Sequence, residues 1–82
     1  MRKIGGKYQT SGDLTKLDGT PIPDDEPVLL FRAKDALLPK LLEHYLELCM
    51  EAGSPEEHLS DLREQIDLIR DWQGAHSAKT PD

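Results

Sequence analysis

Apolar side chains recur at intervals of three and four residues through the second half of the chain, with charged residues between them. This spacing is typical of an amphipathic helix that buries one face. It predicts a helix over residues 36–52, with Asp35 as the N-cap. Because proline lacks an amide, the helix begins either near Asp35 or at Pro39, with 36–38 as a preceding turn. The residues of this first stripe are Leu38, Leu41, Leu42, Tyr45, Leu48, Cys49 and Ala52.

A second helix is predicted over residues 55–73, where Leu59, Leu62, Ile66 and Ile69 repeat in a 3-4-3 rhythm. The break between the helices lies at residues 53–57. There, Gly53 suits a left-handed turn, and Ser54 and Glu57 have the spacing of a capping box, in which each side chain bonds the other's amide. Gly74 is the expected helix stop. The pattern therefore predicts two antiparallel helices.

The first half of the chain has the composition of short strands and turns. Residues 27–33 form a continuous apolar run, which predicts a strand covered on both faces. Residues 7–17 are the other expected strand region, followed by the turn signal Asp18-Gly19. The fold class is α+β: a small antiparallel β-sheet of two to three strands packed on an antiparallel helix hairpin, over residues 7–74. Residues 1–6 are expected to be a flexible N-terminus and 75–82 a disordered tail.

Apolar residues outside the main stripes exceed what one small domain can bury. Leu46 and Met50 form a second strip on the first helix, and Leu68 and Trp72 form a flank on the second. A domain of this length also has little stability to spare. We therefore expect a homo-oligomer, joined through Leu46 and Met50, through Leu68 and Trp72, or through the edge of the sheet.

Charge and hydropathy narrow the setting in which the protein acts. The 82 residues carry a net charge of −6, which disfavours direct binding to nucleic acid. There is no apolar run near 18 residues and no signal-peptide pattern after Met1, so we expect a cytoplasmic protein without a membrane span. Cys49 is the single cysteine; it can form no internal disulfide and is expected in the core.

Residues capable of catalysis do not form a recognisable site. His44 with Glu47, and His58 with Asp61, are spaced i, i+3 on the helices, but neither pair supplies the three ligands of a hydrolytic zinc site. Cys49 has no base on its own stripe. We therefore expect no catalytic residue, no metal and no cofactor, and a protein that is not an enzyme.

One basic cluster is a candidate anion site. Arg32 and Lys34 precede the helix that Asp35 is expected to cap, which places two cations beside free helix amides. Lys7 and Tyr8 would join from the adjacent strand, the tyrosine as a stacking surface. In the alternative interpretation, Arg32 pairs with Asp35 or with the acidic residues 24–26, and only closes the corner between strand and helix.

Part of the chain resembles a known group of proteins. The resemblance rests on Lys7-Tyr8, the segment 18–22 (DGTPI) and the segment 24–35 (DDEPVLLFRAKD), followed by a helix start that contains proline. In these features the chain is similar to short uncharacterised proteins encoded by tailed phages and some bacteria. The resemblance implies a phage or prophage setting and an accessory role, and it supplies no site residue.

Three functions are compatible with these features. The first is a non-enzymatic accessory protein that binds itself or a host protein. The second is a counter-defence protein that sequesters a small phosphate-containing ligand, such as a nucleotide signal, at the basic cluster. The third is a mimic of the nucleic-acid backbone, which would use the acidic residues of both helices. Those residues are Glu43, Glu47, Glu51, Asp61, Glu64, Asp67 and Asp71.

Overall fold

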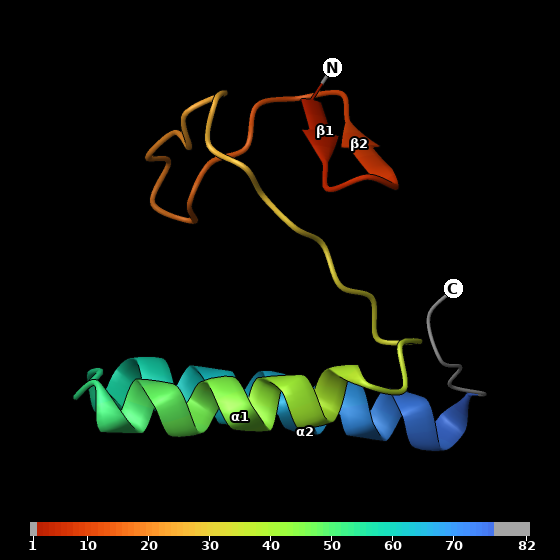
Figure 1. Cartoon of the computed structure of the whole chain (residues 1–82), viewed down its shortest axis with the longest axis vertical. Helices are drawn as coiled ribbons and strands as arrows, with labels where there is room; N and C mark the ends of the chain where they lie inside the picture. Colours follow the sequence, from red (N-terminus) through yellow and green to blue (C-terminus); the bar gives the residue numbers. More distant parts are fainter. Residues whose placement is uncertain (1, 77–82) are drawn as a thin grey trace. The chain divides into compact units, whose positions relative to one another are not determined.

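The structure is a computed structural model and describes residues 2–76. The chain forms two strands followed by two helices (Figure 1). It divides between Leu30 and Phe31 into two compact units. The predicted α+β class with a helix hairpin is confirmed. The elements are β1 (Arg2–Ile4), β2 (Tyr8–Thr10), α1 (Leu38–Glu51) and α2 (Glu56–Ala75).

The first unit begins with a β-hairpin. β1 and β2 are antiparallel, with Lys3 opposite Gln9 and Ile4 opposite Tyr8. Gly5 adopts a positive φ of 65° at the turn, a conformation that costs glycine little. The prediction of a flexible segment over 1–6 is therefore wrong for residues 2–4, because the glycine turn lets them pair with β2.

A second turn follows in the same unit and contains the predicted Asp18-Gly19 signal. The amide of Gly19 donates to the carbonyl of Lys16 (2.9 Å), and Gly19 has a φ of 89°. An isolated bridge joins Thr15 to Pro21. The strand predicted over 7–17 is therefore shorter than expected: Ser11 and Gly12 bend the chain after β2, and only this bridge continues the pairing.

The strand predicted over residues 27–33 is not formed. Within this segment, the carbonyl of Val28 accepts a hydrogen bond from the amide of Gly5 (2.8 Å), beside the turn of the β-hairpin. Leu29 is 71% exposed, and Leu30 and Phe31 are also exposed. A strand requires a partner along its length, and neither β1 nor β2 pairs with this segment. An apolar run alone does not supply that partner.

The second unit is the antiparallel helix hairpin of α1 and α2. α1 ends in a Schellman motif, in which the amide of Ser54 donates to the carbonyl of Cys49 (3.0 Å) and the amide of Gly53 to that of Met50 (3.1 Å). Gly53 has a φ of 77°, which confirms the predicted left-handed turn. The predicted capping box is wrong. Pro55 is the N-cap of α2, and no side chain bonds its first amides. The amide of Ser54 is already used by the Schellman motif.

The outer ends of the two helices also differ from the predictions. α1 begins at Leu38, with Pro39 in its first turn, where a missing amide has no cost. α2 continues through Gly74, the predicted stop, because a helical glycine costs only about 1 kcal/mol. Of the predicted tail 75–82, Ala75 is the last residue of α2, and residues 77–82 lie outside the described part of the chain.

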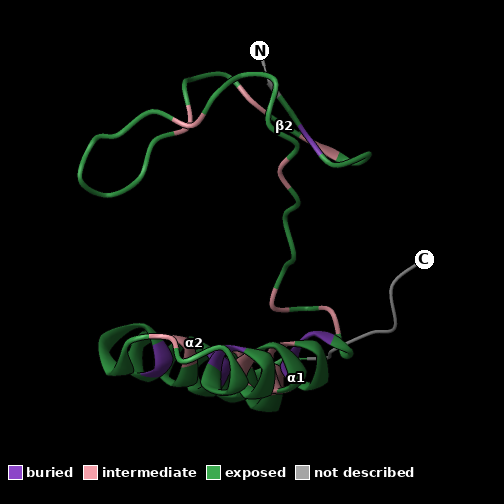
Figure 2. Cartoon of the chain, turned by 60° about the vertical axis from the view of Figure 1, so that its left-hand side comes forward, coloured by how far each residue is buried: buried purple, intermediate pink, exposed green. Residues whose placement is uncertain are grey.

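The core of the hairpin is a narrow seam between α1 and α2. Leu38 and Cys49 of α1 and Leu59 and Ile66 of α2 are buried. Figure 2 shows buried segments in purple on both helices. Leu41, Tyr45 and Leu48 were predicted to belong to the same buried stripe, and this prediction is wrong because about half of each is exposed. The stripe spans more of α1 than a single neighbouring helix covers.

Candidate functional site

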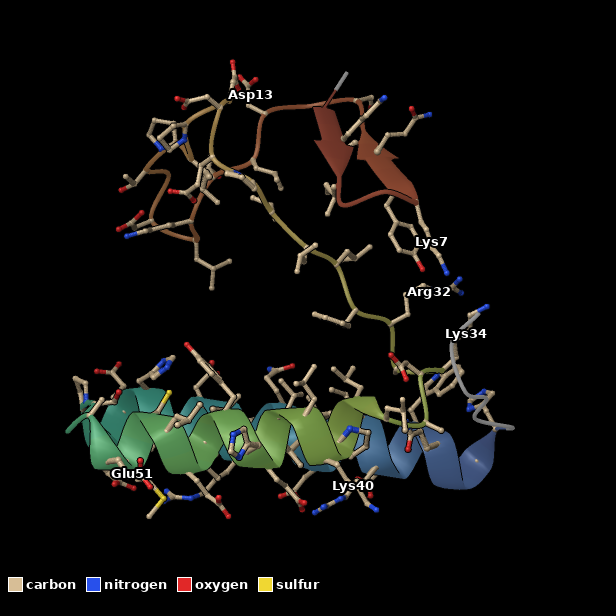
Figure 3. The ribbon with its side chains drawn as sticks, in the orientation of Figure 1. Lys7, Asp13, Arg32, Lys34, Lys40 and Glu51 are labelled. Carbon is tan, nitrogen blue, oxygen red and sulfur yellow. The ribbon has the colours of Figure 1, made fainter. Side chains whose placement is uncertain are left out.

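The residues of the predicted anion site belong to both units. Lys7 and Tyr8 lie in the first unit, whereas Arg32, Lys34 and Asp35 lie in the second. Figure 3 labels Lys7, Arg32 and Lys34, and all three residues are exposed.

The backbone amides that an anion would need near Asp35 already have partners. The carboxylate of Asp35 accepts a hydrogen bond from the amide of Leu37 (2.9 Å). Its backbone carbonyl accepts one from the amide of Leu38 (3.1 Å). Because Pro39 has no amide, these bonds leave little donor capacity in the first turn of α1. This geometry favours the alternative interpretation, in which the residues before α1 close the corner at the start of that helix. The partner of the Asp35 carboxylate is, however, the backbone amide of Leu37 rather than Arg32.

Gln73 holds this corner against α2, a role that the sequence did not indicate. Its side-chain amide donates to the carbonyl of Ala33 (2.9 Å) and to the carbonyl of Asp35 (2.8 Å). The two carbonyls lie before α1 and about forty residues from Gln73 along the chain. A glutamine near the end of an amphipathic helix is usually exposed, so only the tertiary structure reveals this contact.

A second contact that the sequence did not indicate connects Cys49 with His58. Cys49 is 6% exposed, and its Sγ lies 3.9 Å from Nε2 of His58 on α2. Tyr45 joins this group, because a side-chain hydrogen bond with Cys49 raises the pKa of Tyr45. The sequence indicated no base beside Cys49, because His58 belongs to the other helix and only the packing of α1 on α2 brings the two side chains together. The thiol is buried in the seam, where it packs between the helices.

The residues predicted to form an oligomer interface lie on different sides of the hairpin. The ion pair between Arg70 and Glu43 marks one flank, and Met50 follows Glu43 by two helical turns, so Met50 lies on that flank. Trp72 follows Arg70 by two residues, roughly 200° around the helix, so it lies on the opposite flank, with its indole stacked on His76 (4.0 Å between centroids).

These four residues also differ in exposure. Met50 is 53% exposed, Leu68 54% and Trp72 39%, whereas Leu46 is half-buried. No single face therefore contains all four, and each remains a separate candidate contact.

A more continuous apolar surface lies on α1, on the side away from Met50. We call it the α1 flank and define it as Leu37, the N-cap residue before α1, with Leu41, Tyr45 and Leu48 of α1. The four residues are 53%, 46%, 49% and 47% exposed. Their spacing places them within less than a third of the helix circumference. The width of the apolar stripe on α1 was the sequence signal that could have identified this surface, because one partner helix does not cover so broad a stripe.

Charged residues border the α1 flank on the side away from α2. Figure 3 shows Lys40 and Glu51 on the same face of α1, near its two ends. Helical spacing adds Glu47 to this border, and all three residues are exposed. The border is therefore basic near the start of α1 and acidic near its end.

Within residues 2–76, no three side chains of His, Cys, Asp or Glu are grouped in a way that could hold a metal ion. Neither α1 nor α2 is long and apolar enough to cross a membrane.

The chain was also compared with known proteins. No protein-family model, no curated protein and no solved structure matches it. The candidate site therefore rests on the geometry of the chain itself.

Proposed function

We propose that this protein is a non-enzymatic accessory protein of a phage or prophage, which acts in the cytoplasm of the host cell by binding protein. The phage setting is supported by the resemblance of segments 18–22 and 24–35 to short phage-encoded proteins. The partner is a second copy of the chain or a host protein.

One observation carries the proposal of protein binding: the α1 flank is a row of large apolar side chains, each about half exposed, on a rigid helix. Isolated exposed leucines are common, but a continuous row on one helix face is typical of a surface that another protein covers. The flank has an aromatic residue, Tyr45, near its centre, and aromatic residues are enriched in the cores of protein interfaces.

The alternative of a small anionic ligand has weaker support. The amides of Leu37 and Leu38, which would help to hold an anion, bond to Asp35.

The burial of Cys49 favours a packing role over catalysis, because a nucleophile must reach its substrate.

Photo-crosslinking in bacterial cells tests the proposal. A photoreactive phenylalanine analogue is introduced at Tyr45, and separately at Glu64, an exposed residue of α2, as the control. We expect the variant at Tyr45 to form protein adducts, and the variant at Glu64 to form few. Mass spectrometry of each adduct identifies the partner as a second copy or a host protein. The absence of any protein adduct at Tyr45 would contradict the proposal.

A further inference from the structure

The α1 flank has a near-palindromic pattern along the helix. About the point midway between His44 and Tyr45, Leu41 is the mirror position of Leu48, and Leu37 is the mirror position of Ala52. Apart from Tyr45, whose mirror position is His44, a helix with such a pattern presents a similar apolar surface when it is turned end for end. This is the requirement for an isologous contact, in which both copies use the same patch.

We infer that the α1 flank binds the α1 flank of a second copy, with the two helices antiparallel about a two-fold axis that passes between His44 and Tyr45. This inference rests on the proposed function and names its partner. Leu41 then packs against the partner's Leu48, and Leu37 lies beside the partner's Ala52. The two copies of Tyr45 meet near the axis.

The charges along the border of the flank favour the antiparallel orientation. In this arrangement Lys40 lies level with the interval between the partner's Glu47 and the partner's Glu51, at roughly 3 Å along the axis from each. The two-fold axis repeats this cluster at the other end. A parallel pairing would place the border of one copy and the border of its partner on opposite edges of the interface, so Lys40 would not meet the partner's Glu47 or the partner's Glu51. The antiparallel pairing therefore has a charge complementarity that the parallel pairing lacks.

The area of the flank is sufficient for a stable contact. Leu37, Leu41, Tyr45 and Leu48 together expose on the order of 400 Å² per copy. If somewhat more than half of the interface is apolar, as is usual, the two copies bury roughly 1,300 Å² in total. This value lies at the lower end of the range for specific complexes and predicts a dimer that dissociates upon dilution.

Other apolar residues of the hairpin are poorer contacts between copies. Leu68 is surrounded on α2 by Glu64, Asp67 and Asp71, so that pairing through this face would bring acidic residues together. Met50 lies on the flank that carries the ion pair between Arg70 and Glu43 and has no large exposed apolar neighbour at helical spacing. The α1 flank is the surface where apolar area and complementary charge coincide.

The oligomeric state tests the location of the contact. Sedimentation equilibrium of the full chain is expected to show a dimer at tens of micromolar and dissociation upon dilution. Leu41→Asn should be monomeric at the same concentration. Met50→Asn, which changes a residue of similar exposure on the other flank, should still dimerise, and circular dichroism confirms that both variants keep their helices. A monomeric wild type, or a dimer lost in Met50→Asn and kept in Leu41→Asn, overturns the inference.

Charge reversal and crosslinking test the orientation. Lys40→Glu should weaken dimerisation by about three- to tenfold, and the triple variant Lys40→Glu, Glu47→Lys, Glu51→Lys should restore it. In a mixture of ¹⁴N- and ¹⁵N-labelled copies, a zero-length carbodiimide crosslinker should join Lys40 of one copy to Glu47 or Glu51 of the other. These residues are too far apart within one helix for such a bond. A triple variant as weak as the single one, or intermolecular links that never involve Lys40, overturns the antiparallel arrangement.

The two proposals fail in different ways. If the chain is a monomer and the photoreactive group at Tyr45 forms adducts with a different protein, the inference of a second copy is wrong and the proposed function stands. If the chain is a monomer and no protein adduct forms, both are wrong.

Discussion

Gly53 is the residue on which the tight reversal between α1 and α2 depends. Its φ of 77° lies in the left-handed region, where a β-carbon is unfavourable, and the Schellman hydrogen bonds need this conformation. Gly74 offers a natural comparison, because it lies inside α2 and does not have a positive φ.

Replacing these two glycines by alanine should therefore change stability in opposite directions. Gly53→Ala is expected to lower the free energy of unfolding by about 1 kcal/mol, because alanine is strained at positive φ. Gly74→Ala should raise it by roughly 0.5–1 kcal/mol, because alanine is the better helix former. Urea unfolding followed by circular dichroism measures both. Equal effects of the two changes would contradict the assigned backbone conformations.

The carboxylate of Asp18 gives the first unit a pH-dependent contact. The amide of Thr20 donates to Oδ1 of Asp18 (2.9 Å), and this bond lowers the pKa of Asp18 below its ordinary value of 3.8. Because the folded pKa is the lower one, the contact stabilises the turn at pH values above 3.8 and is lost as the pH falls through the folded pKa.

An NMR titration tests this expectation. The carboxyl carbon of Asp18 should titrate below the ordinary value, and the amide proton of Thr20 should move with the same midpoint. In Asp18→Ala, the amide of Thr20 should lose this titration. A midpoint at or above 3.8 would be inconsistent with the hydrogen bond.

At the scale of elements, the hairpin is held by contacts at both of its ends. The Schellman motif fixes one end, and Gln73 fixes the other by binding the carbonyls of Ala33 and Asp35. The carboxylate of Asp35 closes the same corner through the amide of Leu37. The start of α1 is therefore attached to the end of α2.

Removing the Gln73 side chain should destabilise the hairpin. Gln73→Ala leaves two carbonyls without their donor and is expected to lower the free energy of unfolding by about 1–2 kcal/mol. Gln65→Ala, at an exposed position of the same helix, should change it by less than about 0.5 kcal/mol. Thermal unfolding monitored by circular dichroism compares the two variants. Similar small effects for both would show that the Gln73 contacts do not hold the corner.

At the scale of the whole molecule, the balance of buried and exposed apolar surface is the main feature. Ile4, Leu38, Pro39, Cys49, Leu59 and Ile66 are the buried apolar residues among those described. More large apolar side chains are exposed than buried, and this small core alone supplies little stability. Association is one of the ways in which small domains compensate.

The thermal stability of the helices should consequently depend on protein concentration. If the unit that unfolds is a dimer, mass action raises the midpoint temperature as the concentration increases. Circular dichroism melts over a hundredfold range of concentration should show this rise for the wild type and not for Leu41→Asn. A midpoint that is independent of concentration in the wild type would contradict a dimer that unfolds as it dissociates.

The sequence determined the two helices, the glycine turn between them and the α+β class. These features follow from local patterns: the spacing of Leu59, Leu62 and Ile66 requires a helix with one apolar face, and Gly53 suits a positive φ. The Asp18-Gly19 turn is equally local. Each of these features depends on residues within a few positions of one another, so the linear chain contains the information needed to predict them.

Only the tertiary structure decided which apolar residues are buried and which strands are formed. The run at 27–33 has the composition of a strand but no partner strand. Leu41, Tyr45 and Leu48 have the spacing of core residues, but they remain about half exposed because α2 covers a different side of α1. Pairing and burial depend on what lies opposite in space, as the contacts of Gln73 with Ala33 and of His58 with Cys49 illustrate. The physical reason is that removing apolar side chains from water is favourable wherever they are buried, whereas the fold determines which of them find a neighbouring surface that covers them.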